Sequence, residues 1–146
     1  MNIMNITRPT KTSEIERAWH LVDVKGKILG RSASGIAVLL MGKGKPYFAK
    51  NLDCGDNVVV INAAEVAVSG KKETDKVYTR FSGYPGGLRK ITVKELRERK
   101  PGEIIRHAVA GMLPKNKLKA SMLKRLFVFA GSEHKFQEKF KEVISS

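Results

Sequence analysis

Four short apolar runs along the chain predict β-strands. They are "AWHLVDV" at 18–24, "NVVVIN" at 57–62, "KVYTRF" at 76–81 and "LFVFAG" at 126–131. Runs of four to eight apolar or alternating residues, bounded by turn-forming residues, are typical of strands that lie in a sheet. The pattern therefore predicts a four-stranded sheet.

Between and after these runs, apolar residues recur at helical spacing. The segment 31–42, "RSASGIAVLLMG", predicts a helix with Ser32 as its N-cap and Gly42 as its C-terminal stop. Thr92 and Glu95 have the spacing of a capping box and predict the start of another helix. This helix covers 92–100, and two further helices are predicted at 101–113 and 117–126.

The alternation of strands and helices predicts the fold class. Strands joined through helices form mostly parallel sheets, so we expect one α/β domain with helices covering the sheet. This domain spans 18–131, after an irregular N-terminal arm at 1–17 and before a polar C-terminal tail at 132–146.

The composition of the chain limits which partners and cofactors it is expected to have. The chain has 146 residues and a formal net charge of +14, so the first partner to consider is a polyanion. No apolar run approaches the roughly 18 residues of a membrane-spanning helix, and the amino end lacks a secretory apolar core. We therefore expect a cytoplasmic protein without membrane contact. A single cysteine and three widely spaced histidines give no disulfide and no metal site, and we expect no cofactor or small-molecule substrate.

The stretch "GKILGRSASG" at 26–35 resembles a phosphate-binding loop at first sight. A Walker A loop needs four residues between its glycines and a lysine before the Ser/Thr, whereas only three residues separate Gly26 from Gly30, and Arg31 replaces the lysine. The spacing argues against an enzyme acting on a nucleotide, which stays the alternative function. Two compatible interpretations remain: a tight strand-to-helix turn, or a helix N-terminus where Lys25, Lys27 and Arg31 contact a phosphate.

The charges are unevenly distributed along the chain. Neither 24–52 nor 104–132 contains an Asp or Glu, whereas solvated surface helices normally mix both signs. The bases lie in loops and at helix ends that contain glycine or proline, which favours contact with the backbone of a folded RNA. Tyr47 and Tyr84 could stack on an unpaired base. The candidate RNA-binding residues are Lys25, Lys27, Arg31, Lys43, Lys45, Tyr47, Lys50, Arg80, Tyr84, Arg89, Lys115, Lys117, Lys119, Lys124 and Arg125.

Six segments in a fixed order carry a family resemblance. They are "WHLVDVKGKILGRSAS", "GKGKPYF", "CGDNVVVINA", "SGYPGGL", "GMLPKNKL" and "FVFAGSEH". Together they resemble the bacterial large-subunit ribosomal protein thirteen (L-thirteen) family. The resemblance implies a three-layer α/β/α domain with a parallel sheet. It also implies a non-enzymatic constituent of the 50S subunit that binds 23S ribosomal RNA early in assembly, beside neighbouring large-subunit proteins.

The resemblance also implies residue roles. Lys43, Lys45, Lys115 and Lys117 match the basic loops through which family members contact RNA. Two positions depart from the family pattern: Lys119 stands where a glycine is common, and Lys135 stands where a proline is common. A free-standing RNA-binding regulator outside the ribosome would need the same basic surface and stays open.

Overall fold

The computed structural model describes residues 9–144, the last four by their backbone only. Its centre is a parallel sheet of three strands, β1 (Trp19–Asp23), β2 (Asn57–Ile61) and β5 (Leu126–Val128), in the order β1-β2-β5. Strand β2 is central, and its three valines are fully buried because both faces of the sheet are covered there.

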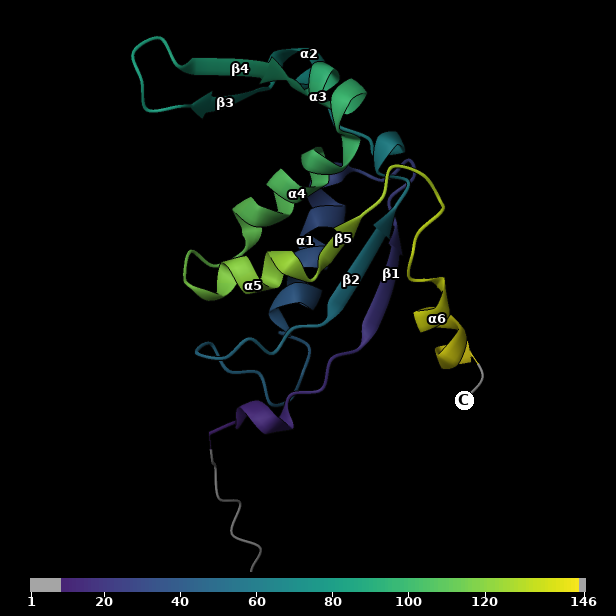
Figure 1. The fold of residues 1–146 in the computed structure, drawn as a ribbon. Coiled ribbons are helices and arrows are strands. Elements are labelled where there is room, and N and C mark those ends of the chain that lie inside the picture. The colour runs from purple at the N-terminus through teal and green to yellow at the C-terminus, as the bar shows by residue number, and fades with distance from the viewer. Residues whose placement is uncertain (1–8, 145–146) are drawn as a thin grey trace, which may run out of the picture.

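The prediction of four strands in one sheet is wrong. The predicted strand at 76–81 forms β3 (Val77–Phe81), which pairs antiparallel with β4 (Leu88–Thr92) in a separate hairpin that projects from the body (Figure 1). The connection at 82–87 is short, with Gly83 and Gly86 at positive φ. Such a connection closes a hairpin, whereas a parallel pair needs a crossover of a dozen or more residues.

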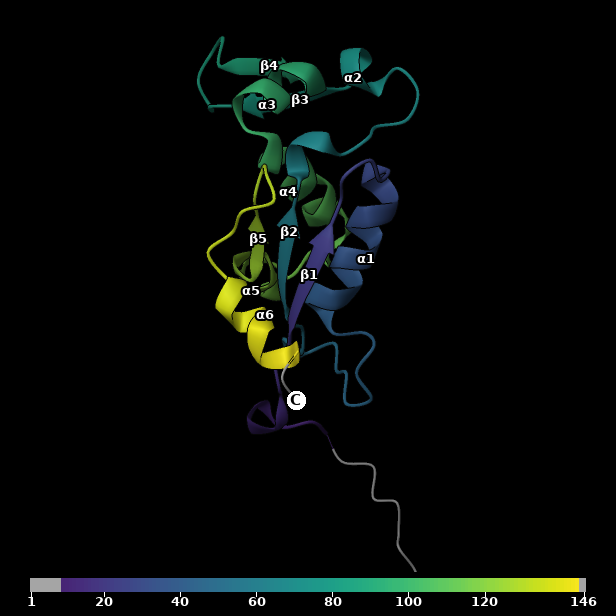
Figure 2. The same ribbon diagram turned by 90° about the vertical axis from the view of Figure 1, so that its right-hand side faces the viewer.

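The crossing helices gather on one face of the parallel sheet. They are α1 (Leu29–Met41), α4 (Pro101–Met112) and α5 (Leu118–Lys124) (Figures 1 and 2). The strands advance across the sheet in chain order, so right-handed crossovers place both connections on the same side. Ile36 and Leu40 of α1 and Ile104 and Ile105 of α4 are almost fully buried in the core there.

The other face of the sheet carries an aromatic cluster. The Trp19 ring lies 5.8 Å from that of Phe127 and 5.0 Å from that of Phe136, centre to centre. Phe136 and Phe140 come from the C-terminal segment, where the short helix α6 (Gln137–Ile144) lies beside β1 (Figure 2). One short helix covers part of this face, so the three-layer arrangement that the resemblance implied is not confirmed.

Smaller elements complete the chain. The hairpin rests on α2 (Lys72–Asp75) and α3 (Val93–Arg99). Of the two 3₁₀ turns, η1 (Thr12–Glu14) precedes β1 and η2 (Ala63–Glu65) follows β2. The turn η1 falls in the predicted N-terminal arm, of which residues 1–8 lie outside the described range. Likewise, α6 falls in the predicted tail, and 145–146 lie outside that range.

Two predicted helix ends are confirmed and one is wrong. Gly42 ends α1 in the left-handed region at φ 78°, and the Thr92 side chain accepts a hydrogen bond from the Glu95 amide at 3.3 Å. Ser32 is not an N-cap, because α1 begins at Leu29, three residues before Ser32. The Leu29 amide donates to the Ala67 carbonyl, so pairing with a neighbouring segment determines where this helix starts.

Candidate nucleic-acid interface

The fold brings the two acid-free windows together. Helices α1 and α4 pack against each other, so the loop after α1 and the loop after α4 line one groove. Lys43 and Lys50 enter the groove from the first loop, and Asn116 enters it from the second, between Lys115 and Lys117 in sequence. These four lysines are exposed, and no hydrogen bond or ion pair holds their ammonium groups within the described part of the chain. We call Lys43, Lys50, Lys115 and Lys117 the loop surface.

Lys45 lies in the same basic loop but is engaged inside the protein. Its side chain is only 16% exposed, and its Nζ lies 2.6 Å from Oδ1 of the buried Asp56. It also donates to the Glu16 carbonyl. Burial alone raises the pKa of Asp56, but hydrogen bonds from Lys45, His20 and the Ala18 amide outweigh it and hold the pKa below its usual value. Lys45 therefore fixes the path of the loop, and RNA contact by Lys45 stays a prediction.

Arg125 has a similar internal position. Its side chain is 11% exposed, and its guanidinium pairs with the Asp53 carboxylate. It also donates to the main-chain carbonyls of Asp56 at 2.7 Å and Leu40 at 3.1 Å. The Leu40 carbonyl belongs to the last turn of α1, where a cation is favourable. Arg125 thus joins the end of α1 to the segment before β2, and RNA contact by Arg125 stays a prediction.

Tyr47 connects the basic loop to the N-terminal arm. Its hydroxyl donates to the Glu16 carbonyl and accepts from the Glu16 amide, both at 3.2 Å. Its carbonyl accepts from the Thr10 hydroxyl at 2.7 Å. The half-buried ring has a structural role at this position, and stacking on a base stays a prediction.

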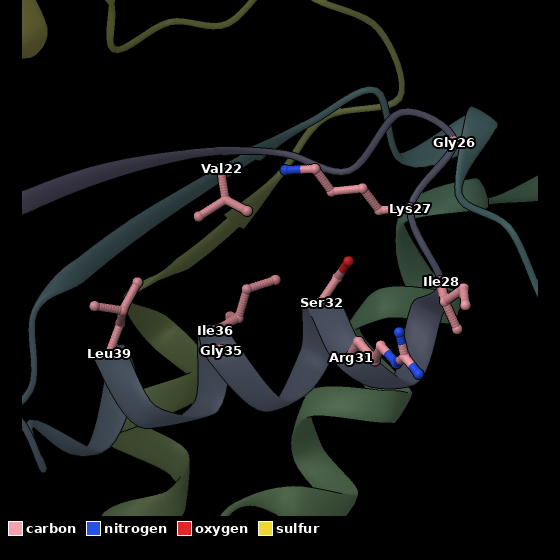
Figure 3. Close-up of a pocket in the computed structure, with 9 residues that line it drawn as sticks. All are labelled: Val22, Gly26, Lys27, Ile28, Arg31, Ser32, Gly35, Ile36 and Leu39. Carbon is pink, nitrogen blue, oxygen red and sulfur yellow. The ribbon is translucent and has the colours of Figure 1, made fainter.

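Residues 25–31, which we call the glycine loop, lie at the other end of α1. Several of them line a groove between β1 and this helix. Figure 3 shows Lys27 reaching along the groove towards Val22, with Ser32 pointing up from the helix into the same space. The Gly26 amide donates to the Glu65 carbonyl at 3.0 Å, and the Leu29 amide to the Ala67 carbonyl at 2.8 Å. Because these amides pair with the chain at 65–67, they cannot encircle a phosphate, and the loop is no nucleotide cradle.

The cations of the glycine loop differ in their surroundings. Lys25 pairs with Glu65 at 3.4 Å across exposed side chains, whereas Lys27 and Arg31 are exposed and make no ion pair in the described part of the chain. Gly26, at φ 66°, makes the turn, as its conformational freedom predicts. Gly30 lies inside α1 instead.

The hairpin holds three further predicted residues at a distance from the loop surface. Arg80 and Arg89 are exposed and lie directly opposite each other on β3 and β4. Tyr84, in the connecting turn, is 75% exposed. On α5, Lys124 is exposed and Lys119 is half-buried. The predicted residues therefore form several separate groups, and the loop surface is the group that two distant segments build together.

Sequence reasoning missed the acids that position the basic loop. Asp53 and Asp56 bind Arg125 and Lys45, and Arg17 donates to the Gly55 carbonyl at 2.6 Å. Their position in the sequence could have indicated this role. They are the first acids after the acid-free window 24–52, and they come immediately before a buried strand. Isolated acids beside a basic segment are candidates for its internal counter-ions.

Among the described residues, no group of His, Cys, Asp and Glu could hold a metal ion. Residues 9–144 also contain no helix with the length and apolar character needed to cross a membrane.

Comparisons with known proteins agree with the sequence resemblance. Residues 17–135 match the family model described as ribosomal protein L13. The chain is 54% identical over 127 residues to the large ribosomal subunit protein uL13 of Caldanaerobacter subterraneus subsp. tengcongensis, covering 87% of this chain and 89% of the relative. It is 51% identical over 140 residues to the protein of the same name from Geobacillus kaustophilus, covering 96% and 97%. The identity to the Clostridioides difficile protein is 49% over 135 residues, covering 92% and 94%.

Proposed function

Because the chain belongs to the ribosomal protein L13 family, we propose that it is a structural constituent of the large ribosomal subunit. We propose further that it binds 23S ribosomal RNA through its basic loops and helix ends and supports early assembly of the subunit. The family consists of ribosomal structural proteins, and the chain is not an enzyme. Its place of action is the large subunit in the bacterial cytoplasm, beside other proteins of that subunit.

The observation that supports RNA binding is the contrast between two kinds of cation in the same region. Lys45 and Arg125 are paired with buried or half-buried acids. The loop surface has no such partners within the described residues. Internal pairs thus hold the loops in place, while four exposed ammonium groups remain to replace the counterions of an RNA backbone. Lys27, Arg31 and Lys124 are exposed in the same way and are proposed as additional phosphate contacts.

The test is the salt dependence of binding to a domain-sized fragment of 23S ribosomal RNA. In a variant with Lys43, Lys50, Lys115 and Lys117 changed to alanine, we expect weaker binding. The slope of log affinity against log salt should fall by about 3, because each phosphate contact contributes roughly 0.7 to 0.9 to it. Filter binding or fluorescence anisotropy at several potassium concentrations measures both quantities.

A matched control removes the same net charge elsewhere. Lys71, Lys94, Lys135 and Lys139 are exposed and lie outside the loop surface. Changing these four to alanine should leave the slope almost unaltered. Equal effects of the two quadruple variants would mean that only net charge matters and would refute the loop surface as the binding site.

A further inference from the structure

A second basic groove lies between the hairpin and the helices α3 and α4. It has a volume of about 770 Å³, within the range of ligand pockets. Its lining includes one acid, Glu103, and five cations: Arg80, Arg89, Lys90, Arg99 and Lys100. We call it the hairpin groove. In Figure 1 the hairpin extends beyond its support on α3 and overhangs α4.

The positions of two arginines reduce the stability of the hairpin. Arg80 and Arg89 are cross-strand partners, and like charges directly opposite each other destabilise a hairpin. Neither guanidinium has an ion pair or hydrogen bond within the described part of the chain. An anion bound between them would remove this repulsion, so their position favours a ligand with phosphates.

The groove also contains a partly open aromatic stack. The ring of Tyr78 lies 5.1 Å from that of His107 at an interplanar angle of 22°, and the Nζ of Lys76 lies 5.3 Å from the centre of the Tyr78 ring. The Tyr78 ring is thus already in contact with His107 and Lys76, whereas His107 is exposed and lines the groove. A base could therefore continue the stack on His107, as bases stack on aromatic side chains in RNA complexes.

One polar group of this stack lacks a partner among the described residues. The Tyr78 hydroxyl is buried and makes no hydrogen bond within that part of the chain. Burial raises the pKa of Tyr78, so the phenol keeps its proton and remains a donor at neutral pH. Because protein atoms enclose this oxygen, an acceptor on a bound ligand, such as a ribose hydroxyl or a base carbonyl, would reach it only if the surrounding side chains moved.

We propose that the hairpin groove binds an unpaired nucleotide of RNA, with its phosphates on Arg80 and Arg89 and its base stacked on His107. The inference rests on the proposed function, but it adds a second contact whose residues are separate from the loop surface. An unpaired nucleotide fits better than a duplex, since paired bases are already stacked and cannot reach a side-chain ring.

The test uses the full-length protein and a ten-nucleotide single-stranded RNA that carries 2-aminopurine. Quenching of the 2-aminopurine fluorescence reports stacking, and anisotropy gives the affinity. We expect His107→Ala to remove the quenching and to weaken binding about tenfold, the order of one base stack, while His107→Phe retains both. The double variant Arg80→Ala/Arg89→Ala should weaken binding at least as much. Lys71→Ala/Lys94→Ala removes the same charge outside the groove and should leave binding within twofold.

Further measurements separate this inference from the proposed function. The loop-surface quadruple variant should bind the ten-nucleotide RNA within threefold of the wild type, yet lose affinity for the ribosomal RNA fragment. If the fragment is still bound normally, the loop-surface assignment fails while the groove stands. If the groove variants bind the ten-nucleotide RNA like the wild type, the inference is overturned. Equal losses of affinity for an RNA duplex or for polyglutamate would overturn it too, because they would reveal charge attraction without a nucleotide site.

Discussion

The buried carboxylate of Asp56 holds the basic loop in position, and its charge can be removed without changing its shape. Its Oδ1 accepts from the Ala18 amide at 3.1 Å and from Lys45 at 2.6 Å. Its Oδ2 lies 2.7 Å from Nε2 of His20. In Asp56→Asn the amide oxygen can replace Oδ1 and the amide nitrogen can face the imidazole. The main loss is therefore the negative charge opposite Lys45.

The expected cost follows from the burial of this pair. Two unit charges about 4 Å apart attract by about 4 kcal/mol at an effective dielectric constant of 20, and desolvation offsets part of this. Removing one partner of a fully buried pair costs about 3 to 5 kcal/mol. Lys45 retains its hydrogen bond to the Glu16 carbonyl and some exposure to water. We therefore expect Asp56→Asn to lower the free energy of unfolding by about 2 to 3 kcal/mol, below the fully buried range.

The pH dependence of this cost has a definite sign. The pKa of Asp56 in the folded protein lies below its usual value of 3.8. The unfolded chain then binds the proton more readily, so the carboxylate stabilises the fold above the unfolded pKa. This stabilisation is lost as the pH falls through the folded pKa. The difference between wild type and Asp56→Asn should be largest above about pH 5 and should shrink below pH 4.

Urea unfolding followed by fluorescence provides the assay. Trp19 is the single tryptophan and lies at the start of β1, next to His20. Adding Lys45→Met completes a double-mutant cycle, in which Asp56→Asn should cost about 1 kcal/mol or less once Lys45 is gone. The exposed Asp75→Asn is the matched control and should stay within about 0.5 kcal/mol of wild type. A coupling energy near zero between positions 45 and 56 would refute the ion-pair argument.

Two further predictions concern packing. A Cβ at Gly55 would lie 1.6 Å from a main-chain oxygen of α1, so Gly55→Ala should lower the free energy of unfolding by about 2 kcal/mol or more. Gly44→Ala has open space around it and should leave the urea midpoint almost unchanged, so equal midpoints for the two variants would contradict the close approach. Phe136→Ala removes a ring that packs on Trp19, and should cost about 3 kcal/mol and shift the tryptophan emission to longer wavelength. An unshifted emission maximum would mean that the C-terminal segment does not cover this face of the sheet in solution.

Local patterns in the sequence were sufficient for most individual elements. The apolar runs at 18–24 and 57–62 are strands, and Gly42 and Thr92 end and begin helices as predicted. These features depend on side-chain periodicity, on backbone freedom and on hydrogen bonds within four residues, all of which can be found in a short stretch of sequence. The family resemblance, which depends on six segments in order, was equally accessible and is confirmed.

The sequence alone determined the α/β class, the basic character and the family of this protein, whereas the tertiary structure decided which basic residues are available to a partner. Lys43 and Lys45 are two residues apart in one acid-free loop, yet one is exposed and the other is paired with Asp56. That difference depends on contacts between residues far apart in the chain, which short-range patterns do not encode. For the same reason, the strand at 77–81 pairs with β4 in a hairpin and is not part of the parallel sheet. Arg80 and Arg89 of this hairpin line a groove together with His107.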